Sequence, residues 1–484
     1  MTFSRRAVLA TLAALAAQPA RAAALTDAQI VEAAFRALHP GLLRYNSERQ
    51  LAARFVRLHR DLPAARDPGA QWLALTTFTA GLRCGHTFVN PNNQEGAGEA
   101  FFQSGRDRLP FTWRWLGGRM IVSDAGPVRG LHPGDEVVAI GGQATKGLLP
   151  ALMALAAADG GADGKRMRLA ELDRRELWPL PDAALPRLAP GLFAEGRVAL
   201  TVRTGAGRLR EVAADLLTRA ERLAQRGSAE FVPREGPVWT SQVLPDRSRL
   251  ITMPTWAVYN SRWDWRAWLD REVDAAIAER APGIILDLRG NAGGTECGDH
   301  LLERLVDREL VRADAQRFVR YRRTPAELDP FLTTWDRSFR NWGDQAVGAD
   351  AKGFYRLTRW DDDPRGSTIR PRGARYDGRL IAIIDATNSS ATFQFAQTVK
   401  THRLGRLVGE PTGGSRRGIN GGAFFFLRLP QCGFALDLPL VATFPVTPQP
   451  DEGIAPDHLV PTRAADLALK SDPQREAAIR LLRA

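Results

Sequence analysis

The chain has 484 residues and contains very few lysines. Its formal net charge of +12 comes from 66 basic and 54 acidic residues, and only five of the basic residues are lysines. These are Lys146, Lys165, Lys352, Lys400 and Lys470. The arginines are scattered and form no basic tail or block, so we do not expect a nucleic-acid-binding protein. The scarcity of lysine also limits which side chain could act as a catalytic amine.

Cysteines and long apolar runs are scarce too. Three cysteines allow at most one intramolecular disulfide. We expect them to be buried thiols, with a bridge between Cys84 and Cys297 as the alternative. No later segment reaches the ~20 apolar residues that a membrane span needs, so we expect no stable span. No group of His, Cys, Asp and Glu has the spacing of metal ligands, and no metal or organic cofactor is implied.

The N-terminus has the pattern of an export signal. Arg5 and Arg6 precede a short alanine-rich apolar run and a small-residue site, with cleavage expected after Ala22. Adjacent arginines favour the twin-arginine route. We therefore interpret residues 1–22 as a signal peptide and expect a periplasmic or secreted protein.

The rest of the chain divides into regions of different pattern. Apolar residues at helical spacing predict a helical region over residues 25–100. Strand-like alternation and glycine turns predict a small β-rich domain over 105–218, with a helical, proline-rich insertion at about 148–194. Buried strands that alternate with helices predict an α/β core with a largely parallel sheet over 236–465. A helix over 466–484 closes the chain.

Two segments of the core combine a buried strand with residues suited to catalysis. In "GIILDLRGNAGGTE", glycines allow close approach of the backbone and can aim N–H groups at an anion. In "IDATNSSATFQFA", serines lie at a helix N-terminus, where free N–H groups and the helix dipole stabilise negative charge. A tight turn and a simple N-cap are the structural alternatives. The residues alone leave both interpretations open.

Together these segments resemble the C-terminal processing (tail-specific) serine peptidase family. "LDLRGNAGG", "NSSATFQFA" and "GRLVGEPTGG" occur in the family's order, and "GLHPGDEVVAIGGQ" resembles its PDZ domain. The resemblance implies a crotonase-like parallel-sheet protease core, a PDZ-like β domain and a helical N-terminal region. It also implies Ser390 as the nucleophile, with backbone N–H groups of Gly293, Gly294 and Ala391 as the oxyanion hole.

In the best-known branch of the family, a lysine accepts the proton of the nucleophilic serine. This chain departs from that branch in the residue that would accept the proton of Ser390. Ser415 occupies the expected lysine position, and the adjacent arginines do not deprotonate near neutral pH. Lys400 lies ten residues along the helix after Ser390 and points away from it. A tricorn-like branch instead uses a histidine that precedes the PDZ domain. This resemblance implies His86, in "GLRCGHTFVN", as the general base.

A histidine base needs a group that sets its tautomer and stabilises the imidazolium. The segment "QPDEGIAPD" lies near the place where the tricorn-like branch supplies a glutamate. Glu452 is therefore the first candidate and Asp451 the second, with a solvated turn as the structural alternative. Thr87, next to His86, could orient the ring instead.

These expectations describe an exported serine endopeptidase that acts on peptides or proteins, including through the substrate's C-terminus. The alternative is a catalytically inactive periplasmic protein of the same fold that binds peptides or hydrophobic ligands. The missing lysine and Phe393, where the family often has glutamate, are compatible with such a loss.

Overall fold

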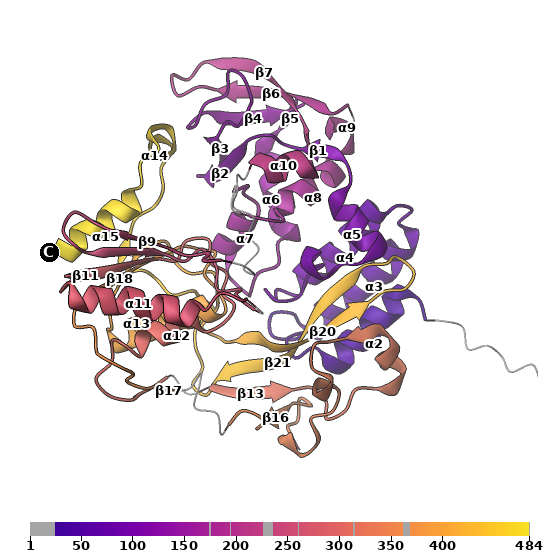
Figure 1. Cartoon of the computed structure of the whole chain (residues 1–484). Coiled ribbons are helices and arrows are strands. Elements are labelled where there is room, and N and C mark those ends of the chain that lie inside the picture. The colour runs from indigo at the N-terminus through magenta and orange to yellow at the C-terminus, as the bar shows by residue number, and fades with distance from the viewer. Residues whose placement is uncertain are drawn as a thin grey trace, which may run out of the picture.

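A helical region, a small β domain and a larger core surround the centre of the molecule in the computed structural model (Figure 1). The structure describes residues 25–483 apart from 174–175, 194, 226–235, 260, 313–314 and 362–367. The predicted signal peptide lies outside the described residues. No described helix has the length and apolar character needed to cross a membrane.

The core contains a six-stranded sheet in the order β22-β19-β18-β11-β10-β9. Every neighbouring pair is parallel except β9 and β10, which confirms the predicted, largely parallel sheet. The strands are β9 (Thr240–Val243), β10 (Arg249–Thr252), β11 (Gly283–Asp287), β18 (Arg379–Ile384), β19 (Arg406–Gly409) and β22 (His458–Leu459).

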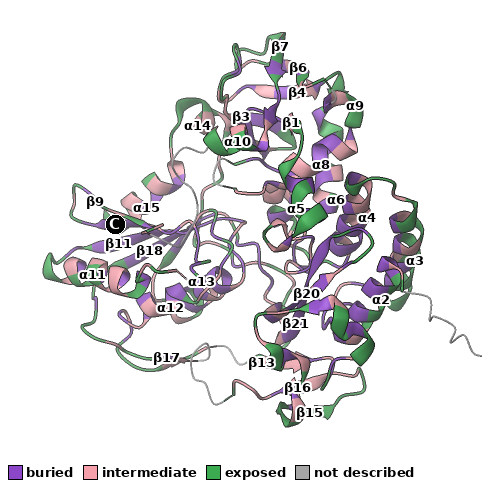
Figure 2. Cartoon of the chain, turned by 45° about the vertical axis from the view of Figure 1, so that its right-hand side comes forward, coloured by how far each residue is buried: buried purple, intermediate pink, exposed green. Residues whose placement is uncertain are grey.

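Helices cover both faces of this sheet, which explains its unbroken apolar strands. Ile284 and Leu286 of β11 pack with residues of the helices on one face, whereas Ile285 packs with the C-terminal helix on the other. All residues of β11 are buried (Figure 2). Each such isoleucine or leucine contributes roughly 1.5–3 kcal/mol through burial. The helices are α11 (Trp265–Ala278), α12 (Cys297–Leu302) and α13 (Ala391–His402) on the first face, and α15 (Pro473–Arg483) on the second.

A smaller antiparallel sheet precedes the core, with the order β2-β3-β4-β6-β7 and with β5 paired to β4. Gly117 and Gly118, at φ 58° and 75°, form the turn between β2 and β3 and agree with the glycine turns expected in this region. The strands are β2 (Thr112–Leu116), β3 (Arg119–Asp124), β4 (Glu136–Ile140), β5 (Gln143–Ala144), β6 (Arg197–Arg203) and β7 (Leu209–Asp215). Between β5 and β6 lie α6 (Leu148–Leu155), α7 (Asp163–Leu169), α8 (Leu180–Leu188) and α9 (Pro190–Phe193).

The N-terminal helices pack on a long antiparallel hairpin contributed by the C-terminal half (Figure 1). The helices are α2 (Asp27–Leu38), α3 (Glu48–Ala64), α4 (Pro68–Gly81) and α5 (Gly96–Gln103). The hairpin, β20 (Ile419–Arg428) and β21 (Ala435–Pro445), is part of a six-stranded sheet completed by β13 (Ala315–Val319), β14 (Leu332–Thr333), β15 (Ala346–Ala349) and β16 (Tyr355–Leu357). Phe35 and Phe78 share one apolar cluster with Phe425 and Leu438 of the hairpin. This packing brings the segment after α4 against the C-terminal half.

Two adjacent strands of the parallel sheet end where the candidate site begins. β11 and β18 are parallel neighbours, with Asp287 opposite Ile383. The glycine-rich turn follows β11 and the serine segment follows β18. The carboxyl ends of parallel strands meet at one edge of a sheet, so the two motifs lie side by side.

Candidate active site

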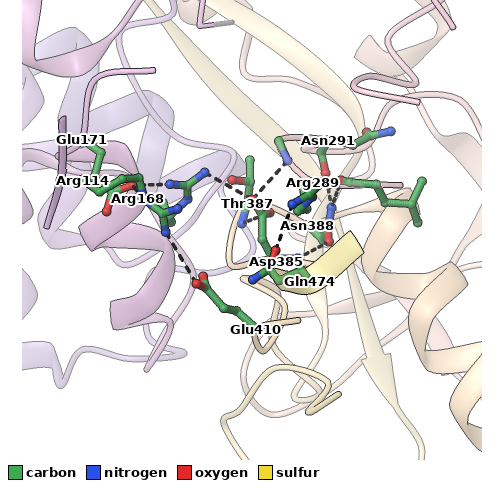
Figure 3. A network of polar contacts seen from close by, with 12 residues as sticks. Arg114, Arg168, Glu171, Arg289, Asn291, Asp385, Thr387, Asn388, Glu410 and Gln474 are labelled. Carbon is green, nitrogen blue, oxygen red and sulfur yellow. Dashed lines mark hydrogen bonds and ion pairs between the residues drawn. The ribbon is translucent and has the colours of Figure 1, made fainter. Parts of the chain in front are cut away.

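The segment between β18 and α13 is held by Asp385 and Asn388. The N–H of Asp385 donates to Oδ1 of Asn388 (2.8 Å). Nδ2 of Asn388 donates to the carbonyl oxygens of Leu288 (2.6 Å) and Asn291 (2.9 Å) in the turn after β11. Figure 3 shows Asp385, Asn388 and Asn291 in this arrangement. These bonds fix the two serines that follow relative to the glycine turn.

Ser390 has a strained backbone at the start of α13. Its φ of 53° and ψ of −126° lie in a region that residues other than glycine rarely adopt. It occupies the N-cap position of this twelve-residue helix, but its side chain makes no capping hydrogen bond. The simple capping alternative therefore does not describe Ser390. A strained serine between a strand and a helix N-terminus is typical of a nucleophile.

Gly293 packs directly on Ser390. Its φ is 102°, and a Cβ at this position would lie 2.8 Å from Cβ of Ser390 and 3.0 Å from the backbone nitrogen of Ala391. Only glycine permits this approach. The N–H of Gly293 donates to Oδ1 of Asn291 (2.9 Å) and is thus occupied. Among the described contacts, the N–H groups of Gly294 and Ala391 have no hydrogen-bond partner, so they are the free donors of the expected oxyanion hole.

Ser389, the neighbour of Ser390, is enclosed and fully engaged. It is 2% exposed. Its hydroxyl donates to the carbonyl oxygen of Ala292 (3.1 Å) and accepts a hydrogen bond from Nζ of Lys165 (2.7 Å). Its N–H donates to Oγ1 of Thr392 (3.1 Å). Of the two serines, Ser390 is the one without a side-chain partner among the described hydrogen bonds.

His86 follows α4 and lines the same cleft as Ser390. Its Nδ1 is buried and has no hydrogen-bond partner among the described residues, and its ring centroid lies 6.0 Å from that of Phe424. Burial lowers the pKa of His86, the charge of Asp159 opposes this shift, and the charge of Lys165 adds to it. A lowered pKa keeps the ring neutral and able to accept a proton. No described hydrogen bond joins the side chains of His86 and Ser390.

The cleft is built from all parts of the molecule and has a volume of about 2330 Å³. Its walls include His86 from the helical region, Lys165 from the small β domain, Ser390 from the core and Phe424 from the hairpin. Sites for small molecules usually occupy about 300–1,000 Å³. This larger cleft has room for an extended chain.

The two carboxylates expected to support the histidine have other partners. Glu452 is exposed and forms an ion pair with Arg416 (3.1 Å). Asp451 accepts hydrogen bonds from Oγ of Ser415 (2.9 Å) and from the N–H of Gly161 (2.8 Å). Among the described hydrogen bonds, neither carboxylate reaches the histidine ring.

Three further expectations can be compared with the structure. Thr87 does not orient the ring of His86, because its hydroxyl pairs with Nε2 of His39 (2.8 Å). Lys400 forms an ion pair with Asp457, which agrees with its exclusion as a base. No disulfide forms, because all three cysteines are free and buried: Cys84, Cys297 and Cys432.

Two buried charged residues that the sequence did not single out lie at the site. Oδ1 of Asp159, a residue that is 2% exposed, accepts a hydrogen bond from the N–H of Gly85 (3.0 Å), directly before His86. Lys165 on α7 is 8% exposed and donates to Ser389. Both belong to the segment interpreted as an insertion. The one available signal was the rarity of lysine in an arginine-rich chain.

A buried ionic network joins the same segment to the end of β18, the strand that precedes Ser390 (Figure 3). Arg168 of α7 contacts Asp385 (3.3 Å) and pairs with Glu171. Arg114 of β2 contacts Glu171 (2.7 Å) and Glu410 (3.6 Å). The small β domain is therefore tied to the end of β18 by charged groups shielded from solvent, where the loss of one partner is costly.

Comparison with known proteins identifies one part of the chain. Residues 249–458 match the model of Peptidase family S41. The match includes the glycine turn and Ser390, and it supports a serine-type peptidase. It does not include His86, Asp159 or Lys165. No protein with a curated description matches the sequence.

The fold is similar to solved structures of mature CPAF. Mature CPAF has 16% sequence identity and a TM-score of 0.62, and the alignment covers 94% of this chain and 95% of that chain. Mature CPAF complexed with lactacystin has 17% identity, a TM-score of 0.60 and coverage of 94% and 96%. The photosystem II D1 C-terminal processing protease has 15% identity and a TM-score of 0.41, with coverage of 90% and 94%. At these identities the CPAF structures support a shared fold alone.

Proposed function

We propose that this chain, whose residues 249–458 match a peptidase family, is an exported serine peptidase of the C-terminal processing type. The observation that carries the proposal is the backbone of Ser390, at φ 53° and ψ −126°, which is strained at a helix N-terminus and packed against Gly293. His86 lines the same cleft and is the only histidine there that we expect to act as a base. This arrangement favours catalysis over the binding-protein alternative.

In the proposed reaction, the neutral ring of His86 takes the proton of Ser390 as Oγ attacks the peptide carbonyl. The N–H groups of Gly294 and Ala391 donate to the oxyanion, and each such donor typically lowers the barrier by about 3 kcal/mol. His86 then gives the proton to the leaving amine, whose bond to the acyl carbon breaks. Water, deprotonated in turn by His86, releases the acid from Ser390 and restores the enzyme.

The imidazolium formed in this cycle needs a nearby negative charge. The resemblance to the tricorn-like branch nominates Glu452 first and Asp451 second. The charge of Asp159 favours the protonated form of His86, and its carboxylate holds the adjacent backbone of Gly85. We therefore assign the stabilisation of the imidazolium to Asp159.

We assign substrate capture to the small β domain as a PDZ-like module. A peptide could add as a strand to its sheet and extend into the cleft, which suits processing of a protein near its C-terminus. The aromatic side chains of Trp178, Trp335 and Phe424 in the cleft lining would contact apolar side chains of the substrate.

Export is the part of the proposal that rests on the sequence alone. Arg5 and Arg6 stand before the apolar run of the predicted signal. Replacing both by lysine should retain the protein in the cytoplasm of its host. Cell fractionation would measure this, and an unchanged distribution would exclude the twin-arginine route.

Fluorophosphonate labelling tests the catalytic proposal. The wild-type protein should be labelled, whereas Ser390→Ala should not be labelled and His86→Ala should react at least about 100-fold more slowly. The tryptic peptide from Leu380 to Lys400 contains both Ser389 and Ser390, so fragmentation of that peptide identifies the modified serine.

Two results would contradict the proposal. An unlabelled wild-type protein that binds peptides without cleaving them would support the inactive binding protein. Label that survives Ser390→Ala and maps to Ser389 would make Ser389 the nucleophile. Circular dichroism of each variant is the control for folding.

A further inference from the structure

The ammonium group of Lys165 lies at the segment that carries Ser389 and Ser390. Its side chain passes the loop around Ser415, the position at which the resemblance expects a lysine. Lys165 lies on α7, and its side chain passes over Gly413, where a Cβ would lie 2.8 Å from Cβ and 2.9 Å from Cδ of Lys165. Gly413 is two residues before Ser415. The absence of a side chain at Gly413 leaves room for a side chain that arrives from another domain.

Lys165 is linked through one hydroxyl to the glycine turn. Its Nζ donates to Oγ of Ser389 (2.7 Å), and that hydroxyl donates its own hydrogen to the carbonyl oxygen of Ala292 (3.1 Å). Ala292 directly precedes Gly293, which packs on Ser390. The chain of hydrogen bonds therefore runs from the small β domain to the backbone that forms the expected oxyanion hole.

This lysine is buried without an ion pair. No carboxylate lies within ion-pair distance of Nζ among the described residues, and the one described hydrogen bond of Nζ is to Ser389. Burying an ammonium without a paired charge is costly, so a neutral side chain would serve a purely structural contact better. The position instead places the ammonium against Ser389, in the cleft that His86 also lines.

We propose that Lys165 is a positioning residue of the peptidase site, which holds Ser389 and the glycine turn against Ser390. This inference rests on the proposed function. Lys165 is not the base in this arrangement, because it donates to a hydroxyl whose hydrogen is already given to Ala292.

The charged and titratable groups around Lys165 and His86 set the sign of the pH effect. Asp159 and Lys165 act on His86. Lys165 is itself affected by burial, which lowers its pKa, and then by Asp159, Cys84, Arg166 and Glu176. Removing the cation at residue 165 should raise the pKa of His86. Acylation needs the neutral ring, so its loss at acidic pH would then begin at a higher pH.

Three variants test the proposal: Lys165→Met, Lys165→Arg and Ser389→Ala. The readout is the rate of fluorophosphonate acylation as a function of pH. Lys165→Met should lower the rate at neutral pH by about 10-fold or more. It should also move the acidic limb of the pH profile, where the rate falls as the pH decreases, to higher pH. Lys165→Arg keeps the charge, so it should slow acylation without moving the limb. Ser389→Ala removes the link to Ala292 and should also slow acylation while the limb stays in place.

A second measurement does not depend on activity. The histidine ring signals can be followed by NMR against pH, with His86→Ala used to assign the signal of His86. Its pKa should rise in Lys165→Met and stay close to the wild-type value in Lys165→Arg. This titration remains informative even if Ser390 proves not to be the nucleophile, so the two proposals can fail separately.

Two results would overturn the inference. A Lys165→Met protein with slower acylation but an unmoved limb and an unchanged His86 titration would show a purely structural lysine. Loss of acylation in Lys165→Met as complete as in Ser390→Ala, with His86→Ala still active, would make Lys165 the base.

Discussion

The α-carbon of Gly293 lies so close to the side chain of Ser390 that a methyl group on it would sit 2.8 Å from Cβ of Ser390. Two segments separated by almost a hundred positions are therefore in direct van der Waals contact. The contact sets the distance between the serine hydroxyl and the backbone donors on both sides of it.

Gly293→Ala should abolish most of the activity. The added methyl group would push the turn away from Ser390 and force alanine into φ 102°, so we expect acylation to fall by about 100-fold or more. Gly290→Ala is the matched control. It also has a positive φ (79°), but a Cβ there meets nothing within 4 Å. It should lower stability by about 1–3 kcal/mol and leave the acylated serine unchanged. Equal loss of acylation in both variants would argue against a specific role of the Gly293 contact.

Asp159→Asn should move the acidic limb of the pH profile to lower pH. The carboxylate raises the pKa of His86, so an amide in its place lets the ring stay neutral in more acidic solution. The amide oxygen can still accept the N–H of Gly85. Glu452→Gln is the comparison, because Glu452 pairs with Arg416 at the surface. A limb that moves in Glu452→Gln and not in Asp159→Asn would restore Glu452 as the partner of the histidine.

Asp437 on β21 should make the folded protein less stable as the pH rises from about 4 to about 6. Burial raises the pKa of Asp437 from 3.8 to about 6, although it accepts hydrogen bonds from Asn90 (2.7 Å) and Asn93 (2.8 Å). The folded state then binds the proton more tightly than the unfolded state. The resulting destabilisation is absent below about pH 4 and complete above about pH 6, with a size of roughly 3 kcal/mol.

Asp437→Asn should remove this pH dependence. Urea unfolding of the wild type and the variant at several pH values between 4 and 7 measures the difference, in which contributions from other groups cancel. Parallel curves for the two proteins would show that Asp437 titrates normally.

Arg168→Met should destabilise the protein and weaken the site together. The change removes the cation that contacts Asp385 and leaves Glu171 with Arg114 alone, and breaking a buried ion pair in this way typically costs about 3–5 kcal/mol. Arg416→Met removes an exposed ion pair and should cost at most about 1 kcal/mol. Denaturant midpoints and acylation rates of both variants test this. A similar, small effect of the two changes would mean that the network in Figure 3 contributes little.

The sequence predicts the parts of the fold whose residues are local. The apolar runs of β11 and β18 are buried on both faces, and Gly117 and Gly118 form a hairpin turn at positive φ. The hairpin of β20 and β21 was not predicted. Its residues are as apolar as those of the core strands, and pattern alone does not tell which sheet an apolar strand joins.

The candidate site is predicted only where adjacent motifs define it. The register of β11 and β18 brings the glycine turn to Ser390, and both lie in short, recognisable segments. Lys165 and Ser389 are separated by 224 positions, and their contact depends on how the small β domain docks onto the core. On the sequence alone, Phe393 is compatible with lost activity, because the family often has glutamate at this position. In the structure its ring fills the core and packs against Gly414, so it has a structural role.

Because the small β domain docks onto the core, the groups of the candidate site come from separate parts of the chain. A fragment of residues 236–484 would retain Ser390 and the glycine turn in one continuous piece. It would lack His86, Asp159 and Lys165, all of which come from earlier in the chain. Grafting that fragment onto another protein would transfer Ser390 with the strands that hold it, and it would leave behind the groups that we propose to control the proton.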